Sequence, residues 1–135
     1  MAIPTFGTKL PRRTYQTRPG AYAVIQNDNG KIAVVKTHGS KYLFLSGGGI
    51  DAGESPEETV VREVGEECEL GIDLLYEIGR ADHYVYSDTK ELGLHKQATF
   101  FAARLNNKKV PKIELDHELV WHPFSYLYFT ISSLI

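Results

Sequence analysis

Three glutamates near the middle of the chain, Glu63, Glu66 and Glu67, stand at positions i, i+3 and i+4. On a helix this spacing places the side chains on one face, where like charges cost a few tenths of a kcal/mol per pair unless a cation joins them. Magnesium suits that role, because it prefers oxygen ligands, keeps several waters and commonly lies between protein carboxylates and substrate phosphates. The spacing therefore predicts a site for a hard divalent cation and a phosphorylated ligand.

A helix is expected at residues 56–68 to carry these carboxylates. Ser55 is a favourable N-cap, Pro56 suits the first helical position, and the acids that follow interact well with the helix dipole. Beside the acidic face, the helical wheel predicts an apolar stripe of Val60, Val61, Val64 and Cys68. A turn is predicted before the helix, at Gly47, Gly48 and Gly49. Glycine can adopt positive φ, and its backbone can approach a ligand closely.

This stretch resembles the Nudix box, the signature of the Nudix hydrolase family, from Gly48 to Leu70. The positions that set the register are Gly48, Glu54, Arg62, Glu63, Val64, Glu66 and Glu67. So many defined residue types over so short a span make a far more specific signal than a lone glycine-rich loop.

Two positions depart from the family pattern. Glu69 stands where the family has glycine, and Gly71 follows two residues later, so we expect the helix to be extended by two residues with Gly71 as its C-terminal cap. Ser46 stands where proline is usual before the glycines, which we expect to loosen the turn while removing no chemical group.

The resemblance implies an α/β (α+β) sandwich of the Nudix type, with a mixed β-sheet covered by the box helix on one face and a C-terminal helix on the other. It also implies a reaction: water attacks a phosphorus of the pyrophosphate in a nucleoside diphosphate linked to another moiety, with Mg²⁺ or Mn²⁺ bound. Glu63, Glu66 and Glu67 would hold the metal, with the carbonyl of Gly48 as a further ligand.

Other residues receive roles from the same comparison. Glu54 is expected to pair with Arg62 and so hold the loop on the helix, because a planar guanidinium suits two-pronged contact with a carboxylate. The proton acceptor for the attacking water is either Glu66 or Glu118, and Glu114 and Asp116 are weaker candidates. His117 is of interest only as the neighbour of Glu118. The residues expected to bind substrate are Gly47, Gly48, Gly49 and Arg18.

The remaining chain is read as one domain over residues 1–135, in which residues 1–17 form an extended basic arm. Strands are expected at residues 21–26, 31–36, 42–45, 74–82, 97–105 and 120–124, and residues 106–111 are expected to form a loop. Residues 125–135 are weakly favoured as the short covering helix over a strand. Because so short a helix covers little of the sheet, a homodimer that buries the remaining apolar surface is expected.

Composition limits the partners. A formal net charge of −2 gives no basic field for polymeric nucleic acid, which favours a small nucleotide substrate. Without a signal-peptide core or a membrane-length apolar run, and with Cys68 as the single cysteine, we expect a cytoplasmic protein with no membrane contact and Cys68 as buried packing.

The substrate and even the class of function stay open at this level. ADP-ribose, coenzyme A, dinucleotides and oxidised nucleoside triphosphates are all compatible with the box. The alternatives to an enzyme are a Nudix-fold sensor that binds a nucleotide without cleaving it, and a structural metal-binding domain without a nucleotide. Retention of the box carboxylates favours the enzyme.

Overall fold

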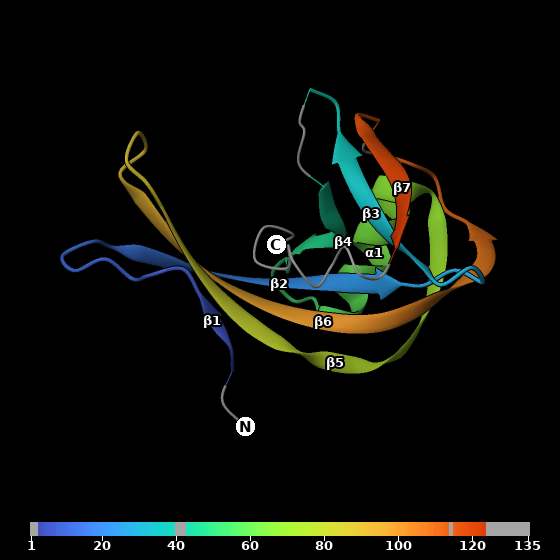
Figure 1. Ribbon diagram of the computed structural model, residues 1–135, viewed down its shortest axis with the longest axis horizontal. Helices are drawn as coiled ribbons and strands as arrows, with labels where there is room; N and C mark the ends of the chain where they lie inside the picture. The colour runs from blue at the N-terminus through green and yellow to red at the C-terminus, as the bar shows by residue number, and fades with distance from the viewer. Residues whose placement is uncertain (1–2, 40–42, 114, 124–135) are drawn as a thin grey trace.

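The computed structural model describes residues 3–39, 43–113 and 115–123. Within these ranges seven strands form a mixed sheet, and α1 (Pro56–Cys68) is the one helix. The strands are β1 (Thr5–Phe6), β2 (Tyr15–Ile25), β3 (Lys31–Thr37), β4 (Leu43–Gly49), β5 (Leu70–Ser87), β6 (Leu92–Lys109) and β7 (His117–Pro123). Their order across the sheet is β1-β5-β6-β2-β4-β3-β7 (Figure 1).

The predicted mixed sheet and box helix are confirmed, and β2 runs parallel to β6. The expected C-terminal helix at residues 125–135, on which the homodimer expectation depended, lies outside the described residues. None of the described helical residues form a segment long and apolar enough to cross a membrane.

Strand β4 changes its partner halfway along its length. Residues 43–45 pair with β3, whereas residues 46–49 pair with β2, opposite Ala23 to Gly20. The glycines expected to form a turn therefore stand in a strand. The residues at which β4 changes partner lie beside α1, so the backbone of β4 contacts the helix that carries the carboxylates.

The strands β5 and β6 are longer than expected and form a long hairpin that extends away from α1, with β2 beside it almost to its tip (Figure 1). The loop prediction for residues 106–111 is wrong over its first part, because Leu70 of β5 pairs with Lys109 of β6. Polar residues such as Asn106 and Lys108 are typical of loops, which is why a loop was expected here. They are accommodated here because their backbones pair while their side chains face solvent or the strand edge.

The expected N-terminal arm is also incorrect in part. Thr5 and Phe6 add to β5 in parallel, and β2 begins at Tyr15 rather than at residue 21. The segment around Arg18 is thus a sheet strand paired with β6, which fixes the direction in which its side chains point.

The core has one cluster under α1 and another on the opposite face. Val60 and Val64 are fully buried against Ala21, Ala23 and Ile25 of β2. Burial of each valine contributes about 1.5–3 kcal/mol. Val61, expected on the same stripe, is instead 42% exposed, because its place on the wheel turns it away from the sheet. The apolar face of α1 is therefore narrower than predicted.

The ends of α1 are defined by local hydrogen bonds. Ser55 and Glu58 form a capping box, with Ser55 Oγ accepting from the Glu58 N–H at 3.1 Å and Glu58 Oε1 accepting from the Ser55 N–H at 3.0 Å. At the other end Glu69, with φ 61°, is the left-handed cap, and Gly71 is already in β5. The predicted two-residue extension is wrong: Glu69 occupies the conformation for which glycine is the usual residue.

We predict that Glu69→Gly stabilises the protein. A side chain in the left-handed region costs roughly 1 kcal/mol, and the exposed Glu69 side chain offers little in return. Urea denaturation should show an increase of about 1 kcal/mol in the free energy of unfolding. The matched control is Glu57→Gly, exposed in the first helical turn, which should instead destabilise by about 1 kcal/mol. A lower denaturation midpoint for Glu69→Gly would contradict the assignment.

Candidate functional site

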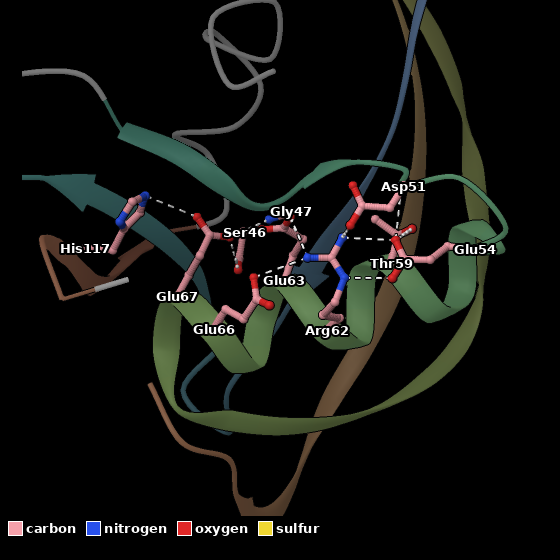
Figure 2. A network of polar contacts seen from close by, with 10 residues as sticks. All are labelled: Ser46, Gly47, Asp51, Glu54, Thr59, Arg62, Glu63, Glu66, Glu67 and His117. Carbon is pink, nitrogen blue, oxygen red and sulfur yellow. Dashed lines mark hydrogen bonds and ion pairs between the residues drawn. The ribbon is translucent and has the colours of Figure 1, made fainter. Parts of the chain in front are cut away.

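Arg62 of α1 is the centre of a network of carboxylates (Figure 2). Its Nε and Nη2 donate to the two oxygens of Glu54 at 2.7 and 3.0 Å, which is the two-pronged contact expected from the sequence. Its Nη1 donates to Glu63 Oε1 at 3.1 Å and to Glu66 Oε2 at 3.2 Å. Asp51 stands 3.3 Å from Nη2. One guanidinium therefore joins the loop before α1 to the acidic face of the helix.

Glu54 is held from three sides. Besides Arg62, the Thr59 hydroxyl donates to Glu54 Oε1 at 2.9 Å and the backbone N–H of Asp51 donates to it at 3.1 Å. These contacts, led by the Arg62 hydrogen bond, lower the pKa of Glu54 to about 2. The same pair raises the pKa of Arg62. The link between loop and helix therefore stays ionised throughout the range in which such a protein works.

Glu67 has a different environment from its neighbours, because it is buried and only 7% exposed. Its Oε1 accepts from the Gly47 N–H at 2.9 Å and from the Ser46 hydroxyl at 3.1 Å, both in β4. Its Oε2 lies 3.5 Å from His117 Nε2. Burial raises the pKa of Glu67 to about 7, although the two hydrogen bonds from β4 act in the opposite direction. This carboxylate is poised to gain or lose a proton near neutrality.

Ser46 contributes more than its departure from the family pattern suggested. The side chain is fully buried, and its hydroxyl also accepts from Cys68 Sγ at 3.7 Å. Serine in place of proline thus adds a hydrogen-bond donor to Glu67, which the sequence did not predict. Cys68 is buried as expected, and burial raises the pKa of its thiol to about 11.

Two glycines permit the close contacts of β4, one with α1 and one with β2. A Cβ on Gly48 would lie 2.8 Å from the Glu63 carboxyl group, so the missing side chain makes room for that carboxylate. Gly47 has φ +155°, and a Cβ there would lie 2.2 Å from the Ala21 carbonyl oxygen. A side chain at Gly48 would push α1 away from β4, whereas one at Gly47 would push β4 away from β2.

His117 is the residue that sequence reasoning undervalued. It lines a hollow of about 270 Å³ together with Glu67, Gly47, Tyr22 and Val35. Its Nδ1 lies 2.9 Å from Asp116 Oδ1, and this contact lowers the pKa of Asp116. The strand pattern of residues 117–123 was the available signal, because alternate residues of a strand face opposite sides.

That alternation also separates Glu118 from the helix carboxylates. Glu118 lines another hollow with Lys36, Val120 and His122, on the side of β7 opposite to His117. The structure does not bring it to the box residues. Glu114 lies outside the described residues. Arg18 also stands apart from the carboxylates and lines a hollow with Gly49 and Tyr22.

The donor set suits a hard divalent cation. Among the described residues no group of three or more His, Cys, Asp or Glu side chains stands ready to hold an ion. Glu63 and Glu66 nevertheless direct an oxygen each at the same nitrogen of Arg62, so they converge on one cationic position. Mg²⁺ needs only one or two carboxylates when waters and substrate phosphates complete its shell. The carboxylates of Glu63 and Glu66 thus fit a metal site whose coordination shell is completed by water and substrate phosphates.

Comparisons with known proteins agree with this geometry. The NUDIX domain family model matches residues 16–131, most of the chain. A Bacillus subtilis (strain 168) protein named "Putative 8-oxo-dGTP diphosphatase" is 34% identical over 73 residues, which is 54% of this chain and 49% of that protein. The match thus spans about half the length of that relative.

Solved structures show the same fold. A MutT NUDIX hydrolase from Burkholderia pseudomallei is 30% identical with a TM-score of 0.61, covering 82% of this chain and 85% of its own. A MutT protein from Methanosarcina mazei Go1 has a TM-score of 0.65 at 20% identity, covering 90% and 85%. A UDP-X diphosphatase has a TM-score of 0.61 at 22% identity, covering 85% of this chain and 55% of its own. With the family match over residues 16–131 and the box residues gathered around Arg62, the chain belongs to the Nudix family.

Proposed function

We propose that this protein is a divalent-metal-dependent pyrophosphohydrolase that cleaves a nucleoside diphosphate linked to another moiety. The observation that carries the proposal is the convergence of Glu63 and Glu66 on one cationic position, close to the hollow where Glu67 meets His117. Membership of a family with relatives named as diphosphatases supports the reaction class. The metal is Mg²⁺ or Mn²⁺, as the oxygen donors favour.

The box residues then have two kinds of role, metal binding and positioning of the loop. Glu63, Glu66 and Glu67 supply carboxylate oxygens to the metal, and the carbonyl of Gly48 is a further donor. A bound metal ion would neutralise charge on the phosphates and lower the pKa of bound water. Arg62 keeps its contact with Glu54 and so holds the loop in place while the metal occupies the carboxylates it now contacts.

Glu67 is one candidate for the proton acceptor, through an oxygen that the metal leaves free. Without metal its pKa is about 7, and its Oε2 lies 3.5 Å from His117 Nε2. Glu66 remains the alternative on the same helix face. Glu118 loses support because β7 directs it away from these residues.

Hydrolysis of a nucleotide panel to nucleoside monophosphate, followed with and without Mg²⁺, tests the proposal. We expect turnover only with metal, and we expect Glu66→Gln and Glu67→Gln each to reduce kcat by roughly 10²- to 10⁴-fold, because an amide is a weak metal ligand and cannot accept the proton. Glu57→Gln, on the same helix but exposed, is the matched control and should retain activity. Nucleotide binding without turnover in the wild type would instead identify a sensor.

The apparent affinity for Mg²⁺ should decrease as the pH is lowered, because protons compete with the metal for Glu67. A carboxylate with a pKa of about 7 is mostly ionised at pH 8 and mostly protonated at pH 6. Metal titrations should therefore show a decrease of roughly tenfold from pH 8 to pH 6. Glu67→Gln should bind metal more weakly but with a much flatter pH dependence. An equally steep dependence in that variant would mean that another group titrates.

Arg62 and Glu54 should act as one unit. Arg62→Lys and Glu54→Gln should each lower kcat/KM by roughly tenfold or more, since each removes the two-pronged contact. The double variant should be little worse than either single one. Asp51→Asn is the control, because the Asp51 side chain is 73% exposed and its contact with Arg62 should contribute little. Additive losses would mean that Arg62 acts on the substrate independently of Glu54.

A further inference from the structure

A row of nitrogen-bearing side chains crosses three neighbouring strands on one face of the sheet. His83 of β5 pairs with Lys96 of β6, and Lys96 pairs in turn with Arg18 of β2. Residues directly opposite each other on paired strands project to the same face of a sheet. The three side chains therefore stand side by side, although they are far apart in the sequence.

Arg18 and Lys96 line a hollow of about 190 Å³ whose other walls include Gly20, Gly49 and Tyr22. Gly20 and Gly49 pair with each other across β2 and β4, so the floor there carries no side chains. A Cβ on Gly20 would lie 3.2 Å from the Tyr22 hydroxyl oxygen. The Tyr22 ring therefore points along β2 towards Arg18, and its hydroxyl lies next to Gly20.

Of the two cations in this hollow, Lys96 is partly shielded from water, whereas Arg18 is exposed. Lys96 is half-buried, and burial lowers the pKa of its ammonium group. Next to it, His83 has a buried Nδ1 without a hydrogen-bond partner. Burial and the charge of Lys96 lower the pKa of His83. A partly desolvated ammonium group gains more from a bound anion than a fully hydrated one does.

Tyr22 connects this hollow to the carboxylate site. It also lines the hollow that contains Gly47, Glu67 and His117. Burial first, and then the charges of Glu63 and Glu67, raise the pKa of Tyr22. The acidic and basic hollows therefore adjoin across the Gly47–Gly49 part of β4.

We propose that Arg18, Lys96 and the Tyr22 hydroxyl form an anion subsite that binds a phosphate group lying beyond the pyrophosphate held at the helix carboxylates. The class of substrate selected is a nucleoside triphosphate or longer polyphosphate, in preference to a nucleoside diphosphate linked to an uncharged sugar. The subsite itself rests on the geometry of β2, β4 and β6, whereas its place in the reaction rests on the function proposed above.

Inorganic tripolyphosphate is the probe for the subsite, because in the absence of Mg²⁺ its binding can be measured without turnover. We expect isothermal titration, with and without Mg²⁺, to show roughly tenfold weaker binding for Lys96→Gln and Arg18→Gln and a smaller loss for Tyr22→Phe. Lys96→Arg should largely restore affinity. Lys90→Gln, which removes the same charge from the exposed β5–β6 turn, should bind like wild type. Wild-type affinity in Lys96→Gln, or no binding by wild type, would overturn the subsite.

Steady-state kinetics with Mg²⁺ separates the subsite from the proposed activity. Lys96→Gln should raise KM for a nucleoside triphosphate roughly tenfold with little change in kcat, and leave KM for a sugar-linked nucleoside diphosphate near its wild-type value. An equal loss on both substrates would overturn selective phosphate binding. If wild type hydrolyses neither substrate, the proposed activity fails, while the tripolyphosphate titration still decides whether the subsite exists. Circular dichroism melting should confirm that each variant is folded.

Discussion

The close contact between α1 and the crossover of β4 is the constraint on which the site depends. Glu67 is buried at this contact and accepts hydrogen bonds from Ser46 and from the Gly47 backbone. Hydrogen bonds to a charged group contribute about 1.5–3 kcal/mol each, which offsets part of the desolvation of the carboxylate. Because Gly48 has no side chain, Glu63 can lie against the same strand. The contacts of Glu67 and Glu63 with β4 therefore require α1 and β4 to lie close together.

The charge balance around Arg62 fits the further cation that the proposed function includes. Four carboxylates, those of Asp51, Glu54, Glu63 and Glu66, contact a single guanidinium. Glu54 takes the strongest contact, with both oxygens engaged. Glu63 and Glu66 both accept from the remaining Nη1. A divalent cation that takes over these two groups would leave the structural pair intact, which separates the positioning role of Arg62 from metal binding.

The partner change of β4 is equally important for access to the site. Residues 46–49 pair with β2 and residues 43–45 with β3, so the sheet opens beside the glycines. Hollows lie next to this opening, one with Glu67 and His117 and another with Arg18 and Lys96. Tyr22 lines both of them. An extended, charged ligand can therefore contact groups from the helix and from the far side of β2 at the same time.

Local spacing in the sequence determined the helix and its ion pair. Ser55 and Pro56 specify where α1 begins, and the distance between Glu54 and Arg62 predicts their pairing, because these features act within a few turns of chain. The convergence of Glu63 and Glu66 follows from helical geometry alone.

Only the tertiary structure decided which distant residues join them. The choice of His117 over Glu118 depends on how β7 pairs with β3, and a shift of one residue would exchange the two. The role of Ser46 required the packing of α1 on β4, and the left-handed cap at Glu69 required β5 to begin directly after the helix. The lengths of β5 and β6 were underestimated because mutual backbone pairing overrides the polar composition of their ends. Register, burial and strand pairing are set by contacts between segments far apart in the chain, which no local pattern records.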